Sequence, residues 1–214
     1  MRLPDLKLET ILKHIREHGF ESLDPAVQVQ ANKVLQDHVA RERFETVAAD
    51  PRSWKRSGDR LLGAANLIRT THLTNWRISS DDILYGTFDA AEQRLKFDMH
   101  GVYLLLAGLS IENYAKGAII IAAAKDHVKD GKLKDLNSHD CLELTKRAGV
   151  TLAASEETTL RCLTVHIQWR GRYPTRNDFD EFKELPAMPI GSRIPEDYTN
   201  VDEIVQKLLA ILNG

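Results

Sequence analysis

Two arginines and two aromatic residues lie within five positions of one another, in the string WRGRYPT at residues 169–175. Arg170 and Arg172 carry guanidinium groups, which match the geometry of a phosphate, and Trp169 and Tyr173 offer aromatic faces on which a base can stack. The string therefore predicts a site for an anionic ligand, a nucleotide or RNA. The alternative is structural: Arg170 binds the last carbonyls of a helix and Trp169 belongs to the core.

Glu112 is a carboxylate inside the most apolar stretch of the chain, residues 101–124. A buried carboxylate has to pair with a cation or take up a proton. Lys116, one helical turn later, is one candidate partner, and an arginine of residues 170–176 is the other. We expect Glu112 either to contribute to the ligand site or to form a structural ion pair that fixes the packing.

Histidines are the candidate bases. His166 lies one turn before Arg170, and the same face continues to Tyr173, so an imidazole is expected beside the predicted anion site or packed in the core. His139 is a second candidate, with a surface or capping position as the alternative. The sequence has no HExxH, P-loop or GxGxxG motif, and its two cysteines form no CxxC pair, so no metal site and no cofactor are predicted.

Helical periodicity predominates in the segments that position these residues, and no alternating pattern predicts a sheet. Prolines, glycines and Ser/Asp clusters predict loops over residues 77–98 and 171–200. Ser138 and Ser155 are the expected N-caps of two helices. The predicted fold class is all-α, an up-and-down helical bundle. The expected helices cover residues 4–18, 25–48, 52–72, 99–128, 138–148, 155–170 and 201–212.

The dipeptide Asp50-Pro51 predicts a division of the chain. Residues 1–50 would form an N-terminal helical appendage, because a helix pair of that size buries too little surface to be stable alone. Residues 51–214 would form the main bundle. Within it, we expect residues 104–122 to be the most buried helix, flanked by the helices that contain Ile68 and Leu163.

The charge balance of the chain is nearly neutral, with 29 Lys and Arg against 31 Asp and Glu. This balance excludes a bulk attraction to nucleic acid or to an anionic membrane and leaves local patches. Residues 101–124 have the length of a bilayer span, but the charges in their middle predict a buried helix and no membrane. The first ten residues are charged and lack an apolar segment, which predicts a cytoplasmic location.

Three strings, in their order and spacing, resemble the HEPN superfamily of helical domains. LLAGLSIENYAKGAIII at residues 105–121 resembles the second HEPN helix, and SHDCLELTKRAG at residues 138–149 resembles the short helix with the pattern GHDL…L…AG. WRGRYPT resembles the RYP ending of the fourth helix in the branch of the sacsin C-terminal domain and the helical domain of kanamycin nucleotidyltransferase. The resemblance covers residues 52–174. It implies an HEPN-like bundle, a homodimer, and a non-catalytic module that binds nucleotides or a protein partner.

Catalytic members of that superfamily are metal-independent RNases that use an Arg-x(4–6)-His motif at a dimer interface, and the chain departs from them there. No histidine follows Arg170 or Arg172 at that distance. Two literal matches, at residues 161–166 and 94–100, are as many as chance gives. The resemblance therefore favours binding over catalysis.

Two alternatives stay open. One is a metal-independent RNA endonuclease of a toxin or phage-defence system, in which Arg170 or Arg172 polarises the scissile phosphate and His166 or His139 acts as the general base. The other is a pure structural or interaction scaffold. The arginine–aromatic string favours a ligand over a bare scaffold.

Overall fold

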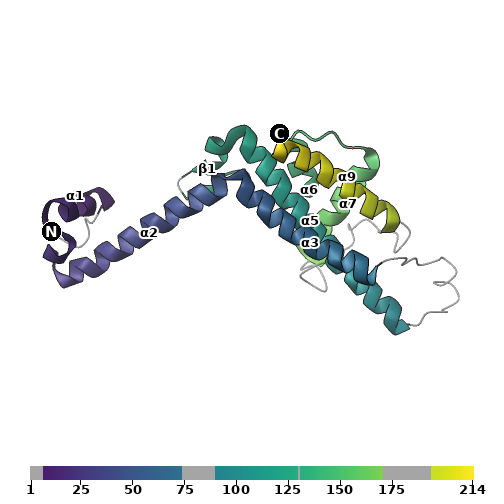
Figure 1. The fold of residues 1–214 in the computed structure, drawn as a ribbon, viewed down its shortest axis with the longest axis horizontal. Helices are drawn as coiled ribbons and strands as arrows, with labels where there is room; N and C mark the ends of the chain where they lie inside the picture. Colours follow the sequence, from purple (N-terminus) through teal and green to yellow (C-terminus); the bar gives the residue numbers. More distant parts are fainter. Residues whose placement is uncertain (1–6, 74–89, 130, 171–193) are drawn as a thin grey trace, which may run out of the picture. The chain divides into compact units, whose positions relative to one another are not determined.

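The computed structural model describes residues 7–73, 90–129, 131–170 and 194–214. These residues form seven α-helices, which confirms the all-α fold class (Figure 1). A 3-10 turn, Phe20–Ser22, follows the first helix, and a π-helical turn, His166–Arg170, continues α7. The α-helices are α1 (Leu8–His18), α2 (Pro25–Ala49), α3 (Pro51–His72), α5 (Ala90–His127), α6 (Cys141–Arg147), α7 (Ala154–Val165) and α9 (Ile194–Asn213).

A two-residue hairpin follows α5, where no sheet was expected. Strand β1 (Val128–Lys129) pairs antiparallel with β2 (Lys132–Leu133). Gly131 in the turn has a φ of +69°, a left-handed conformation that glycine adopts without strain. An Asp-Gly dipeptide in the sequence is itself a hairpin signal, although the residues around positions 130–131 show no strand pattern.

Two helices begin earlier than the sequence indicated, so two expected loops are partly wrong. Helix α5 starts at Ala90 instead of Met99, because residues 90–98 are mostly strong helix formers. Helix α9 starts at Ile194 within the expected loop over residues 171–200. Pro195 is compatible with the first turn of a helix, and the acidic residues that follow it suit the helix dipole.

Each Asp-Pro dipeptide begins a helix, at or next to the expected helix starts at residues 25 and 52. Asp24 Oδ1 accepts a hydrogen bond from the backbone N–H of Ala26 at 2.9 Å, at the start of α2. Asp50 Oδ1 accepts one from the N–H of Arg52 at 3.1 Å, and Pro51 occupies the first position of α3. Each aspartate satisfies an amide that the helix leaves without a partner.

The expected N-cap of α6 was two residues too early. Asp140, not Ser138, is the N-cap: its Oδ1 accepts hydrogen bonds from the N–H groups of Leu142 and Glu143 at 2.9 and 3.0 Å. Ser138 Oγ instead accepts from the N–H of Asp140 at 3.1 Å. A charged carboxylate is the stronger acceptor at a helix N-terminus, and this explains the difference.

The expected cap of α7 was also displaced. Ser155 lies inside the helix, and Ala153 occupies the N-cap position. Glu156 reaches back, and its carboxylate accepts a hydrogen bond from the N–H of Ala153 at 2.6 Å. The acid of the Ser-Glu-Glu sequence therefore satisfies this helix end, and the serine does not.

The chain divides into two compact units, Met1–Ala49 with Lys125–Lys134, and Asp50–Ala124 with Asp135–Gly214. The first unit thus includes the hairpin and the end of α5, which the range 51–214 would have assigned to the bundle. Helix α5 has a non-helical residue, Ala123, next to this division.

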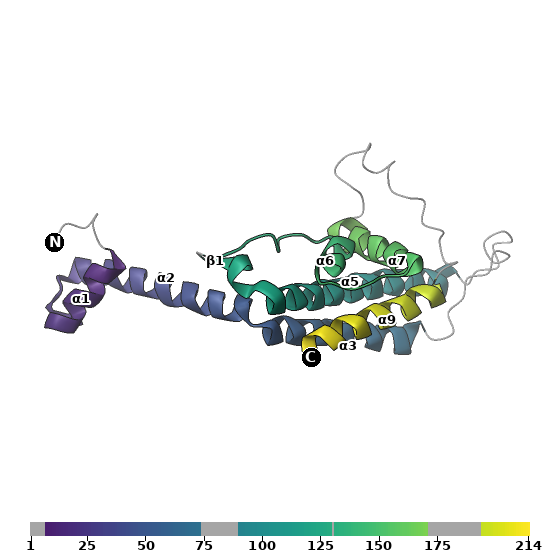
Figure 2. The same cartoon turned by 90° about the horizontal axis from the view of Figure 1, so that it is seen from above.

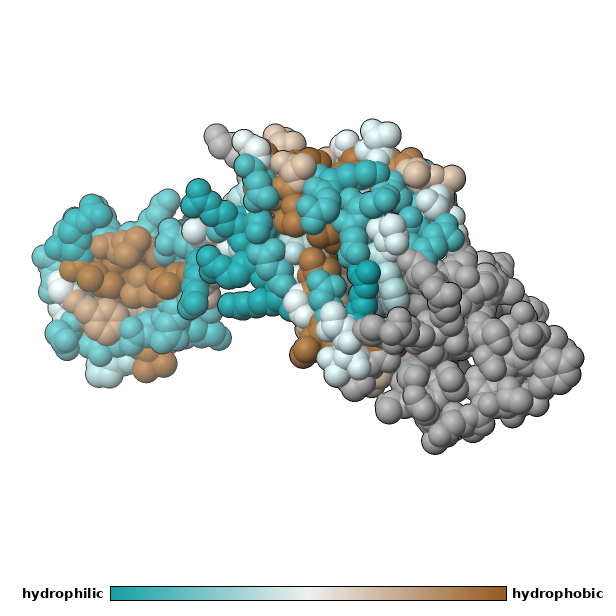
Figure 3. Space-filling model, turned by 45° about the vertical axis from the view of Figure 1, so that its right-hand side comes forward, coloured by the Kyte–Doolittle hydropathy of each residue, from teal (hydrophilic) through white to brown (hydrophobic). Residues whose placement is uncertain are grey.

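The first unit has a small core of its own, which α1 and the first half of α2 form. Apolar side chains gather on one face of this helix pair (Figure 3). The N–H of Gly131 also donates a hydrogen bond to Glu45 Oε1 at 2.6 Å, which ties the hairpin to α2. The buried core residues are Ile11, Leu23 and Ala31, with Ile15, Phe20, Val27, Val34 and Leu35 packed against them.

Helix α5 is the centre of the second unit. Figure 2 shows α6 and α7 on one side of it and α3 and α9 on the other. Ile111 and Ala115 are fully buried and Ile119 is 5% exposed, which confirms the expected core helix. Residues Met99–Ala123 are long and apolar enough to cross a membrane by length and composition, but 72% of the window is buried inside the protein.

Glycines let the neighbouring helices approach α5 closely. A Cβ at Gly58 in α3 would lie 2.6 Å from the ring of Tyr114, and one at Gly108 in α5 would lie 3.0 Å from Ile167 and 3.2 Å from Leu163. The flanking helices are therefore those expected, α3 and α7.

Candidate functional site

The first two residues of the arginine–aromatic string lie on a rare backbone conformation. Trp169 and Arg170 end the π-helical turn His166–Arg170, the single π turn of the described residues. Such turns are rare and occur frequently at functional sites. The side chains of Trp169 and Arg170 lie outside the described part of the structure, as do Arg172 and Tyr173 altogether.

His166 opens the π turn and is buried, with 7% of its surface exposed. Its Nδ1 lies 3.1 Å from the carbonyl oxygen of Cys162 and 3.9 Å from that residue's Sγ. The imidazole therefore donates from Nδ1 to the carbonyl one turn earlier. This arrangement fits the packing interpretation of His166 better than the role of an exposed base.

His100 on α5 lies close to His166, and the charge of His166 affects the pKa of His100. Burial, and then the nearby His166, lower the pKa of His100 to about 4. Its Nδ1 lies 3.1 Å from the Oη of Tyr198 on α9. His100 is therefore neutral at pH 7 and bridges α5 to α9 beside the π turn.

An aromatic and ionic cluster surrounds this bridge. The rings of Tyr198 and Tyr103 are nearly perpendicular with their centres 4.8 Å apart, and the guanidinium of Arg69 lies 4.9 Å from the centre of the Tyr198 ring. Arg69 also donates from one nitrogen to both carboxylate oxygens of Asp202 at 2.8 and 3.0 Å. We call His100, Tyr103, Tyr198, His166, Arg69 and Asp202 the π-turn cluster. Most of this cluster cannot be predicted from the sequence, because its members come from four separate helical segments.

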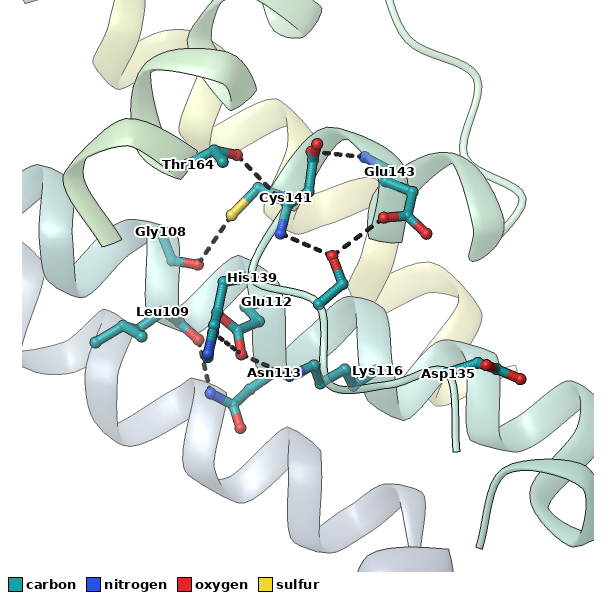
Figure 4. Close-up of polar contacts among 12 residues, drawn as sticks. Gly108, Leu109, Glu112, Asn113, Lys116, Asp135, His139, Cys141, Glu143 and Thr164 are labelled. Carbon is teal, nitrogen blue, oxygen red and sulfur yellow. Dashed lines mark hydrogen bonds and ion pairs between the residues drawn. The ribbon is translucent and has the colours of Figure 1, made fainter. Parts of the chain in front are cut away.

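Glu112 forms an ion pair with one of the two cations that the sequence predicted as its partner. Lys116 Nζ lies 2.6 Å from Glu112 Oε1, and both side chains are only 7% exposed (Figure 4). The ammonium also lies 5.8 Å from the centre of the Trp54 ring, a cation–π contact. Of the two predicted partners, Lys116 is confirmed, and the arginines of residues 170–176 lie outside the described residues.

A second partner of Glu112 comes from the turn before α6. His139 Nδ1 lies 3.0 Å from Glu112 Oε2 and 3.2 Å from Oε1 (Figure 4). The carboxylate can only accept, so Nδ1 carries the hydrogen and donates it. The side chain of His139 is 47% exposed, which places a buried acid behind a half-exposed imidazole.

Cys141 joins this region to α7 and offers no nucleophile. Its backbone N–H donates to Thr164 Oγ1 at 3.0 Å, and its thiol donates to the carbonyl oxygen of Gly108 at 3.6 Å. Burial raises the pKa of the Cys141 thiol well above its usual range, and the charge of Glu112 raises it further. The thiol stays protonated and serves the packing of α6 on α5.

The candidate site residues fall into two centres instead of one. His100 and Glu112 lie twelve residues apart on α5, which at 1.5 Å per residue is about 18 Å along the helix. His166 lies near His100 and interacts with it electrostatically, whereas the polar partners of Glu112 are Lys116 and His139. Among the residues that the structure describes, no group of three or more His, Cys, Asp or Glu side chains could hold a metal ion.

Comparison with known proteins adds no relative. No family model matches the chain, and neither the curated proteins nor the solved structures give a match. The resemblance to the HEPN superfamily therefore stays a prediction from residues 52–174.

Proposed function

We propose that the chain is a helical module that binds an anionic ligand, a nucleotide or RNA, at the π-turn end of its second unit, and that this site binds the ligand without catalysis. The observation that carries this proposal is the π turn, because it falls on the string that the sequence marks by its guanidinium and aromatic groups. A π turn widens the helix and redirects the side chains that follow it, and such turns are enriched at functional sites.

The described neighbours of the π turn favour binding over catalysis. His166 is buried and its Nδ1 donates within its own helix, while His100 is neutral and bonded to Tyr198. Arg69 is paired with Asp202. The cations proposed to bind the ligand are Arg170, the last residue of the π turn, and Arg172, two residues later in the sequence.

The energetic balance supports an anion here in spite of the helix dipole. The C-terminal end of a helix opposes a negative charge by about 0.3 to 1 kcal/mol. Charge-assisted contacts from two arginines contribute about 1.5 to 3 kcal/mol each and outweigh this opposition. Binding is expected to weaken as salt rises, because phosphate contacts release counterions.

The test is a titration of the full chain with ATP and with a short fluorescent RNA at two salt concentrations. The double variant Arg170→Ala/Arg172→Ala should lose binding while its circular dichroism spectrum stays helical. Arg161→Ala is the matched control. The side chain of Arg161 on α7 is 67% exposed and lies 3.8 Å from Glu157, which is the distance of a weak surface ion pair.

Equal affinities of the wild type and the double variant would refute the proposed site. Absence of wild-type binding to either probe would favour the scaffold interpretation instead. Cleavage of the RNA by the wild type, but not by the double variant, would replace the proposal by the endonuclease alternative.

A further inference from the structure

His139 is held at one ring nitrogen and open at the other. Nδ1 donates to the carboxylate of Glu112, which fixes the neutral tautomer with its lone pair on Nε2. No described residue forms a hydrogen bond with Nε2, and 47% of the side chain is exposed. The imidazole is therefore held at Nδ1, and its Nε2 has no hydrogen-bond partner among the described residues.

Glu112 is suited to hold that imidazole in place. It is 7% exposed, and Lys116 engages its Oε1, so Oε2 is left to face His139. A carboxylate withdrawn from water keeps a fixed direction and stabilises positive charge that develops on the ring. The His38–Glu42 pair shows the contrast: its separation is 3.2 Å, but Glu42 is 66% exposed and water competes for its oxygens.

We propose that His139 is a nucleophilic catalytic residue for a neutral acyl ester or thioester, with Glu112 as its positioning residue. This activity lies beyond the proposed ligand binding at the π turn and does not depend on it.

The charges around His139 decide the substrate class. The Glu112–Lys116 pair is neutral overall, whereas Asp140, the next residue, keeps a negative charge at the N-cap of α6. A phosphate anion would be repelled there. A neutral carbonyl compound is not repelled, and the cationic intermediate that it forms is stabilised by the same charge.

The reaction balances with water as its second reactant. Nε2 adds its lone pair to the carbonyl carbon, and the bond from that carbon to the leaving oxygen or sulfur breaks, releasing the alcohol or thiol as its anion. The acyl-imidazolium that remains keeps its Nδ1–H bonded to Glu112. Water then adds to the acyl carbon, the carbon–nitrogen bond breaks, the carboxylic acid departs, and the proton released by water protonates the first leaving group.

The experiment measures hydrolysis of p-nitrophenyl acetate by the full chain from the release of p-nitrophenolate. Wild type should react faster than free imidazole at the same concentration of imidazole groups. His139→Ala should lower the rate by about tenfold or more. Mass spectrometry of the quenched reaction should place an acetyl group on the peptide that contains His139. Wild type no faster than free imidazole, or His139→Ala as fast as wild type, would overturn the proposal.

The role of Glu112 is tested by a neutral and a conservative substitution. Glu112→Gln removes the charge and should lower the rate by about tenfold, whereas Glu112→Asp keeps a carboxylate and should retain most of the rate. The 15N NMR signals of the His139 ring report its tautomer, and Glu112→Gln should mix the two tautomers, because the hydrogen bond that selects one of them is weakened. Glu42→Gln and His38→Ala are the matched controls and should leave the rate within about twofold of wild type. A folded Glu112→Gln variant with the rate and the ring signals of wild type would refute the positioning role.

Discussion

Replacement of Glu112 by alanine is the most informative perturbation of stability, since it leaves Lys116 with no charge partner among the described residues. The ammonium is 7% exposed and lies against the Trp54 ring, so water reaches it poorly. Removing one partner of a buried ion pair costs about 3 to 5 kcal/mol. We expect a loss near the lower limit, about 3 kcal/mol, because the cation–π contact partly compensates the stranded charge.

The assay is thermal or urea unfolding followed by tryptophan fluorescence. All three tryptophans of the chain belong to the ranges of the second unit, so their signal reports that unit. For a chain of this size, about 3 kcal/mol corresponds to a fall of roughly 6 to 12 °C in Tm. The double variant Glu112→Leu/Lys116→Met should recover most of the loss, because it removes both charges and keeps the volume.

Two results would refute this reasoning. A Glu112→Ala variant within about 0.5 kcal/mol of wild type would mean that the pair is solvated and contributes little, as surface pairs do. A double variant less stable than Glu112→Ala would mean that the charges are favourable in themselves and not merely costly to separate.

Four further outcomes follow from the structure. Gly58→Ala should destabilise the second unit by about 1 to 3 kcal/mol in urea unfolding, because its Cβ would lie 2.6 Å from Tyr114, whereas Gly63→Ala, with nothing within 4 Å, should be neutral or stabilising. Since the pKa of His100 is lowered from 6.5 to about 4, its neutral form favours folding at pH 7, and the stability should fall as the pH drops through that interval. His100→Asn should flatten that part of the pH–stability curve. Asp140→Ala should cost about 1 kcal/mol through the lost cap of α6, by the same unfolding assay. Sedimentation equilibrium should give twice the mass of one chain if the homodimer that the HEPN resemblance implies is formed, and a monomer would contradict that expectation.

The features predicted well from sequence are those whose physical cause lies within one or two helical turns. Asp24 and Asp50 begin helices because each precedes a proline and caps an amide two residues later. The Glu112–Lys116 pair follows from the four-residue spacing on one helix. The starts of α5 and α9 were predicted too late. Nearby serine, glycine and proline residues indicated loops, although residues 90–98 are helix formers and an acidic first turn follows Pro195.

The partners that sequence reasoning missed are distant along the chain. His139 contacts Glu112 across 27 residues, and His100 contacts Tyr198 across 98 residues. No local pattern specifies such contacts, because they depend on how the helices pack against one another. Glu112 was expected either in the ligand site or in a structural ion pair, and its described partners, Lys116 and His139, fit the ion pair.

The most direct test of the central claim, that an anionic ligand binds at the π turn, is an NMR titration of the histidine ring protons with ATP or a short RNA. Signals are assigned by His166→Asn and His139→Asn variants. Ligand binding beside the π turn should shift the His166 signal and leave His139 unchanged, because Glu112, which holds His139, lies about 18 Å along α5 from His100. A ligand-dependent shift at His139 with none at His166 would contradict the claim.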